Sequence, residues 1–189
     1  MIAPIETTYK GNKYRSRIEA RHAVFFEHLK ISYEYESQGY QMDNVYYLPD
    51  FYLPLYETFI EIKGKLPEPD ELEKAKRLSK ELSAHVVIFH GSFSEEPMVG
   101  TAYFCGEPLE NGAQWVECKK CHHVDILPRS VPCLWCHYSG NEAVLRRASL
   151  GLSLWCKTRL KTEYTPSSKS LRDASLAAQQ ARFEHGQSG

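Results

Sequence analysis

The sequence has no apolar run that approaches the roughly 20 residues of a membrane-spanning helix. Its N-terminal segment also lacks the continuous apolar stretch of a secretory signal peptide. We therefore expect a cytoplasmic protein that makes no membrane contact. In that reducing compartment cysteines seldom pair as disulfides, so the cysteines of this chain need another explanation.

The chain also has no marked excess of acidic or basic residues, since its formal net charge is −1. The balance nevertheless changes along the chain. Residues 1–100 hold 12 Lys and Arg against 16 Asp and Glu, whereas residues 101–161 hold 8 against 5. Residues 162–189 hold 3 of each sign. A surface that binds phosphate must therefore be local, and the middle segment is the candidate for it.

The sequence contains no internal repeat, and its composition divides it into three parts. Residues 1–100 have the pattern of a mixed α/β domain. Residues 101–161 contain all six cysteines and all three tryptophans. Residues 162–189 begin with a polar, linker-like stretch and end with a segment that can form a helix or stay flexible. We therefore predict an α/β domain, a small cysteine-rich module and a tail.

The first part predicts the element order helix, three strands, helix, strand. A helix begins at Ser16, because Ser16 and Glu19 have the spacing of a capping box. Apolar and aromatic residues then recur at helical spacing. A second helix is predicted over residues 67–83, with Asp70 as its cap. The four predicted strands cover residues 31–42, 46–53, 58–64 and 85–91.

Two carboxylates and an ammonium interrupt the apolar, strand-like sequence around the second and third strands. If residues 53 and 58 flank a four-residue turn, the hairpin register places Asp50 opposite Glu61. Alternation along the strand places Lys63 on the same face as Glu61. Carboxylates so close repel each other, so the pair needs a cation, and a divalent metal ion with oxygen ligands would provide it. A solvated face of alternating charges is the simpler alternative.

A Pro-Asp pair that ends at Asp50, followed by Glu61-Ile62-Lys63, resembles the signature of the PD-(D/E)XK nucleases. The predicted element order is similar to the αβββαβ core of that superfamily. The resemblance covers roughly residues 14–91, a span set by the predicted elements. It implies an α/β fold with a restriction-endonuclease-like core.

The resemblance also implies a set of site residues. Asp50, Glu61 and the main-chain carbonyl of Ile62 would bind Mg²⁺ or Mn²⁺, and Lys63 would orient or activate the attacking water. Glu19 matches an early helical glutamate of many members and would be a catalytic residue as an outer ligand, although a place in a capping box is the alternative explanation. The implied activity is that of a metal-dependent endonuclease that hydrolyses phosphodiester bonds, in DNA by analogy with the family.

Four cysteines form two CxxC pairs, Cys118 with Cys121 and Cys133 with Cys136, separated by eleven residues. Two such pairs suit one closed tetrahedral Zn²⁺ site, and the pattern resembles a zinc ribbon. We predict a structural Zn²⁺ that stabilises a module too small for a core of its own. An iron–sulfur cluster and a redox dithiol are alternatives that the paired spacing favours less.

Basic residues surround these cysteines, and four of them are candidates for contacts with a nucleic-acid backbone: Lys119, Lys120, Arg146 and Arg147. Docking of a protein partner, through the ribbon or through residues 162–189, is the alternative use of this surface. The sequence therefore predicts a nuclease whose zinc ribbon aids binding. Two other interpretations stay open: a nuclease subunit active only within a larger recombination, transposition or defence complex, and an inactive nuclease-fold zinc-ribbon adaptor.

Overall fold

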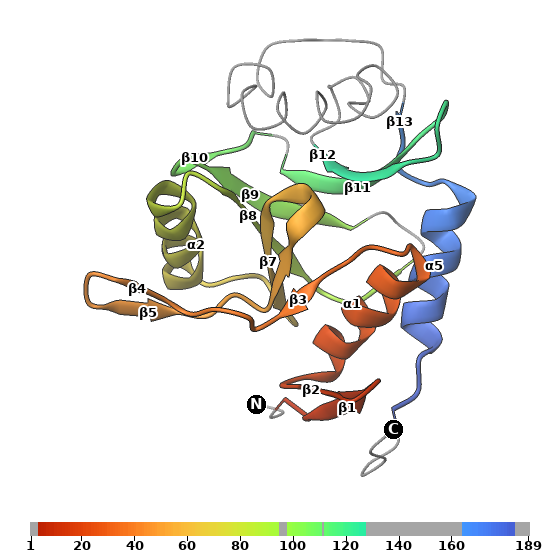
Figure 1. Cartoon of the computed structure of the whole chain (residues 1–189), viewed down its shortest axis with the longest axis horizontal. Helices are drawn as coiled ribbons and strands as arrows, with labels where there is room; N and C mark the ends of the chain where they lie inside the picture. The colour runs from red at the N-terminus through yellow and green to blue at the C-terminus, as the bar shows by residue number, and fades with distance from the viewer. Residues whose placement is uncertain (1–3, 95–97, 111, 128–163, 184–189) are drawn as a thin grey trace.

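The computed structural model describes residues 4–94, 98–110, 112–127 and 164–183. These residues form a mixed α/β fold in which a curled, mixed sheet packs against three helices (Figure 1). In spatial order the main strands of the sheet are β12 (Val124–Leu127), β11 (Ala113–Cys118), β9 (Val99–Phe104), β8 (His85–His90), β7 (Thr58–Lys63), β6 (Phe51–Leu53) and β3 (Glu34–Tyr35).

Shorter strands accompany this sheet. Within it, β10 (Glu107–Pro108) pairs with β9, and β13 (Tyr164–Thr165) pairs with β11. Outside it lie two hairpins, β1 (Thr7–Tyr9) with β2 (Asn12–Tyr14) and β4 (Tyr40–Met42) with β5 (Val45–Tyr47). None of the helices in the described residues is long and apolar enough to cross a membrane.

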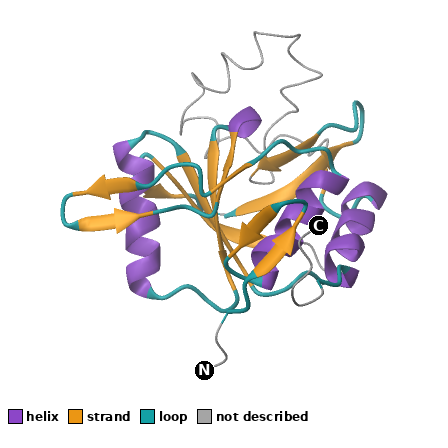
Figure 2. Cartoon of the chain, turned by 60° about the horizontal axis from the view of Figure 1, so that its bottom comes forward, coloured by secondary structure: helices purple, strands orange, loops and turns teal. Residues whose placement is uncertain are grey.

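Helices cover both faces of the sheet (Figure 2). α1 (Arg17–His28) and α5 (Lys169–Gln180) lie side by side and pack on one face, where Phe26 of α1 is fully buried. α2 (Pro69–Glu81) packs on the other face, where Leu78 is fully buried. Because both faces are covered, the central strands carry apolar side chains on each side.

The first helix, α1, begins where the sequence predicts it. Ser16 is the N-cap residue, and its hydroxyl oxygen accepts a hydrogen bond from the Glu19 main-chain N–H at 3.3 Å. Phe25 and Phe26 are buried, in agreement with the predicted apolar stripe. Glu19 is buried as well, at 6% exposure. The helix therefore carries this carboxylate into the interior of the protein.

The β6–β7 hairpin has the predicted register, since Phe51 pairs with Ile60 and Leu53 pairs with Thr58. A 3₁₀ turn, η1 (Pro54–Tyr56), joins the two strands. β8 follows α2 and runs parallel to β7. All but the last residue of β8 is buried, as expected for an apolar strand with both faces covered.

Two of the predicted strands are wrong as continuous elements. The segment 31–42 splits into β3 and β4, which belong to different sheets. Glu36 lies between them in the left-handed region, at φ 43°, where a residue with a side chain rarely continues a strand. The segment 46–53 splits into β5 and β6 at Pro49, which has no N–H to donate to a sheet ladder.

The predicted cap of the second helix is also wrong. Glu68, rather than Asp70, is the N-cap residue of α2, and the capping box joins Glu68 to Glu71. The Glu68 main-chain N–H donates to Glu71 Oε2 at 2.8 Å. Pro69 explains the difference, because its fixed φ and missing N–H suit the first position of a helix.

The predicted boundary between residues 100 and 101 falls within β9, a strand of the main sheet. β9 runs antiparallel to β8, and β11 and β12 continue the sheet beyond it. The Trp115 ring of β11 packs against Phe26 and Phe89 of the core. Cys118 is the last residue of β11 and therefore belongs to a strand of the main sheet.

His22 is buried in α1 among aromatic side chains, and its ring centroid lies 4.6 Å from that of Phe93. Its Nδ1–H donates to the Ile18 carbonyl oxygen at 2.9 Å, whereas Nε2 has no hydrogen-bond partner among the described residues. Burial, only partly opposed by the bond to Ile18, lowers the pKa of His22 to about 4. The folded protein therefore keeps this ring neutral at pH 7.

We predict that, at acid pH, the free energy of unfolding depends less on pH in His22→Leu than in the parent. Between about pH 6.5 and 4 the unfolded chain binds a proton at His22 that the folded protein does not, so stability falls as the pH falls. As the pH falls over that interval, the free energy of unfolding should decrease by up to about 3 kcal/mol less in the variant than in the parent. Urea denaturation at several pH values measures this, with His28→Leu, at an exposed position of the same helix, as control. Parallel profiles for parent and His22→Leu would contradict the assignment.

Candidate active site

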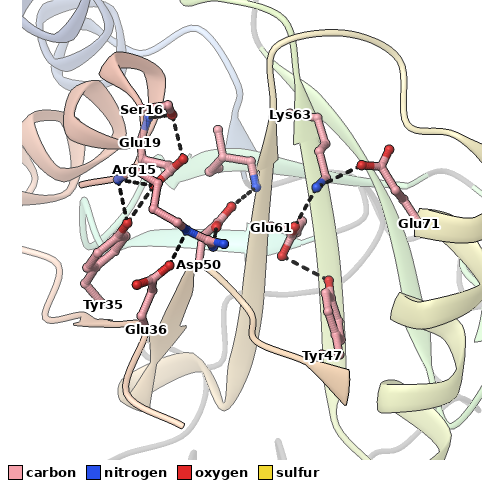
Figure 3. A network of polar contacts seen from close by, with 11 residues as sticks. Arg15, Ser16, Glu19, Tyr35, Glu36, Tyr47, Asp50, Glu61, Lys63 and Glu71 are labelled. Atoms are coloured by element: carbon pink, nitrogen blue, oxygen red, sulfur yellow. Dashed lines mark hydrogen bonds and ion pairs between the residues drawn. The ribbon is translucent and has the colours of Figure 1, made fainter. Parts of the chain in front are cut away.

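Asp50 lies immediately before β6, and its carboxylate is buried (Figure 3). Oδ1 accepts a hydrogen bond from Arg15 Nη2, and Oδ2 accepts one from the Ile62 main-chain N–H, both at 2.7 Å. Burial raises the pKa of Asp50 well above its usual value, and the charges of Glu61 and Glu19 raise it further. The contacts with Ile62 and Arg15 oppose this rise. Three carboxylates therefore share one electrostatic environment.

Glu61 and Lys63 lie two residues apart on β7 and form an ion pair. Glu61 is buried, with Oε1 at 2.8 Å from Lys63 Nζ and Oε2 accepting a hydrogen bond from the Tyr47 hydroxyl at 3.1 Å. Lys63 Nζ also lies 2.9 Å from Glu71 Oε1. Burial acts to lower the pKa of Lys63, but the two glutamates outweigh it and the net shift is upward. The ammonium is therefore held between a strand carboxylate and a helix carboxylate.

Glu19 takes part in the cap of α1 and in the site at the same time. Its Oε1 accepts a hydrogen bond from the Ser16 hydroxyl at 2.6 Å. Its Oε2 accepts two more, from the Tyr35 hydroxyl at 2.6 Å and from the Arg15 main-chain N–H at 3.1 Å. Ser16 thus caps α1 as predicted, but the Glu19 carboxylate binds the Arg15 N–H and the Ser16 hydroxyl instead of the Ser16 main-chain N–H of a capping box. The role of Glu19 as an outer metal ligand stays a prediction.

Arg15 joins the contacts of Glu19, at the start of α1, to those of Asp50, beside the hairpin (Figure 3). Its side chain binds Asp50, and its Nε forms an ion pair with Glu36. Its main-chain N–H binds Glu19 and the Tyr35 hydroxyl, the latter at 3.0 Å. Glu19 and Asp50, both predicted site residues, are therefore linked through a residue that the sequence analysis did not select.

Sequence reasoning missed five members of the network: Arg15, Tyr35, Glu36, Tyr47 and Glu71. One of them had a signal, because a proline at the first helical position makes Glu71 the third residue of α2 and the partner in its capping box. The others carry no periodic or spacing pattern. Their contacts depend on how segments distant in sequence fold together.

Each of the two carboxylates has a cationic partner from the protein, Arg15 beside Asp50 and Lys63 beside Glu61. The divalent ion expected to compensate the pair stays a prediction. The donor set of Asp50, Glu61 and the Ile62 carbonyl is all oxygen, which suits Mg²⁺ or Mn²⁺. Within the described ranges, no three His, Cys, Asp or Glu side chains form a group that could hold a metal ion. A metal on the predicted ligands would therefore have two carboxylates and a carbonyl from the protein.

Only half of the predicted zinc ligands fall in the described residues. Cys118 is buried at the end of β11, and its Sγ accepts a hydrogen bond from the Lys120 main-chain N–H at 3.4 Å. Cys121 is exposed in the turn that follows, as are Lys119 and Lys120. The other predicted ligands and basic residues, Cys133, Cys136, Arg146 and Arg147, lie outside the described residues.

No protein-family model, curated protein or solved structure matches this chain. The contacts described above, and the chemistry that these side chains support, therefore carry any functional proposal.

We predict that Glu71 has two separable roles, capping α2 and holding Lys63. Glu71→Ala removes both, and loss of the cap should lower the free energy of unfolding by about 1 kcal/mol. Glu71→Gln keeps an acceptor for the Glu68 N–H, so it should lose less stability. Both variants remove a negative charge beside Lys63 and should lower its pKa, measured by NMR titration of the lysine side chains.

The matched control for this experiment is Glu73→Gln, since Glu73 lies on the same helix but pairs with Arg77. This variant should leave the titration of Lys63 unchanged. If Lys63 titrates alike in the parent, Glu71→Gln and Glu71→Ala, the contact between Glu71 and Lys63 does not hold the ammonium.

Proposed function

We propose that the protein is a metal-dependent nuclease that hydrolyses phosphodiester bonds, with DNA as the favoured substrate. The observation that carries the proposal is that Asp50 and Glu61 are both buried and close enough for their charges to interact, while Lys63 pairs with Glu61. Burying two carboxylates near each other costs stability, and such arrangements are typical of sites that perform chemistry. The main-chain carbonyl of Ile62, between Glu61 and Lys63, completes the proposed set of metal ligands.

The order of elements around the site supports a restriction-endonuclease-like core. α1 is followed by β3, β6 and β7, which are neighbours in the sheet and pair antiparallel. α2 then crosses over to β8, which is parallel to β7. We assign these six elements to the αβββαβ core of the PD-(D/E)XK nucleases, with β9, β11 and β12 as an extension of its sheet.

The residues of the network have distinct proposed roles. Asp50, Glu61 and the Ile62 carbonyl would hold Mg²⁺ or Mn²⁺, which supplies Lewis-acid polarisation of a phosphoryl oxygen when bound. Lys63 keeps a positive charge where negative charge develops on the phosphate. The contacts of Lys63 with Glu61 and Glu71 fix the ammonium before substrate arrives, so no reorganisation is needed during the reaction.

The alternative of a subunit active only inside a larger complex relied on the tail as a docking segment. α5 instead buries Leu171, Ala174 and Ala178, and it packs along α1. The apolar face of this helix is therefore already occupied within the chain. The alternative of an inactive adaptor is opposed by the intact set of Asp50, Glu61 and Lys63.

Asp50→Asn should reduce cleavage by about 100-fold or more, because one metal-binding charge is lost from the reaction centre. The measurement is cleavage of single-stranded, duplex and branched DNA and of RNA, with Mg²⁺, Mn²⁺ or a chelator. Asp43→Asn is the matched control, the same substitution at an exposed position, and it should cleave like the parent. Full activity in Asp50→Asn, or cleavage that persists in the presence of chelator, would contradict the proposed mechanism.

We further propose that Cys118, Cys121, Cys133 and Cys136 bind one structural Zn²⁺ and that nearby basic residues contact the nucleic-acid backbone. Elemental analysis should find about one zinc ion per chain. Cys121→Ser should lose it, and Cys105→Ser, which changes a cysteine outside the two pairs, should keep it. Iron with labile sulfide in the purified protein would overturn the zinc assignment.

A further inference from the structure

Arg15 is held to the protein in two independent ways. Its main-chain N–H is fixed by Glu19 Oε2 and the Tyr35 hydroxyl. Its guanidinium separately contacts Asp50 and Glu36. Because the main-chain bonds do not involve the guanidinium, the side chain can leave Asp50 without releasing the start of α1.

The guanidinium lies at the boundary between the buried carboxylates and solvent. The Arg15 side chain is 52% exposed, whereas that of Asp50 is 4% exposed. In the described part of the chain, the guanidinium interacts with Asp50, Glu36 and Tyr35. Because it offers five N–H groups and is half exposed, it can also donate to a ligand that approaches from solvent.

A divalent cation and Arg15 would compete for the same carboxylate. Asp50 is a proposed metal ligand, and Arg15 Nη2 now neutralises its Oδ1 at 2.7 Å. A metal ion on Asp50 would place two cations side by side, which is unfavourable in a partly buried site. A phosphate group offers two anionic oxygens that the planar, released guanidinium can bind in a bidentate contact.

We propose that Arg15 is a phosphate-binding residue of this site, held on Asp50 until a divalent cation takes its place and then free to contact the nucleic-acid backbone. The inference rests on the proposed nuclease function and adds a substrate contact to it. It also assigns an order: cation first, phosphate contact second.

The first test measures cation binding without nucleic acid, by titrating the full chain with Mn²⁺ and following free Mn²⁺ by electron paramagnetic resonance. Arg15→Ala should bind Mn²⁺ roughly tenfold more tightly, the factor that one charge-assisted hydrogen bond is worth. Arg15→Lys keeps the charge and should lie between parent and Arg15→Ala. Arg77→Ala is the matched control, since that arginine has similar exposure and also pairs with a glutamate, and it should match the parent.

The second test measures binding of a duplex and a single-stranded DNA oligonucleotide across a salt titration, once with Ca²⁺ and once with chelator. With Ca²⁺, Arg15→Ala should bind more weakly, and its log–log salt slope should fall by about one unit, as for one lost phosphate contact. With chelator, Arg15→Ala should bind as tightly as the parent. Arg77→Ala should behave alike under both conditions.

The outcomes distinguish failure of the Arg15 proposal from failure of the proposed nuclease function. Unchanged or weaker Mn²⁺ affinity in Arg15→Ala and Arg15→Lys overturns the competition with the cation. Equal loss of DNA affinity with and without Ca²⁺ overturns the ordered phosphate contact. If the parent itself shows no Mn²⁺ binding that Asp50→Asn removes, the proposed nuclease function fails as well.

Discussion

The burial of Asp50 and Glu61 in one place is the constraint on which the rest of the site depends. A buried carboxylate loses several kcal/mol of hydration unless partners replace the lost water, and these two also repel each other. The structure gives each carboxylate one cation and one neutral hydrogen-bond donor, with Arg15 beside Asp50 and Lys63 beside Glu61. Loss of a single partner would leave the desolvation cost uncompensated.

The starts of the two helices that flank the hairpin supply much of this compensation. At α1, the cap uses Glu19 and fixes the main chain of Arg15. At α2, the capping box fixes one oxygen of Glu71 on the Glu68 N–H and leaves the other oxygen on Lys63. The same contacts thus cap each helix and assemble the site. The position at which each helix begins therefore decides which side chains reach the hairpin.

The parts of the site that the sequence predicts are those that depend on neighbouring residues. A capping box spans three positions and a four-residue turn fixes a register, so the start of α1 and the pairing of β6 with β7 follow from local chemistry. The contact between Arg15 and Asp50 joins residues 35 positions apart, and no periodicity encodes it. The contact between Tyr47 and Glu61 could not be predicted for a related reason. After the left-handed turn at Glu36, the chain forms the β4–β5 hairpin before it returns to the main sheet.

The two internal cations differ in a way that bears on how the site could change state. The Lys63 side chain is 25% exposed and is held by two glutamates, whereas that of Arg15 is 52% exposed. A ligand from solvent therefore reaches Arg15 first, and an exposed ion pair is worth less than a buried one because water screens it. Apolar residues at positions 50 and 61 would avoid the cost of burial altogether. Under the proposed function, carboxylates at these positions would serve to bind a further cation, which would displace Arg15 rather than the more firmly held Lys63.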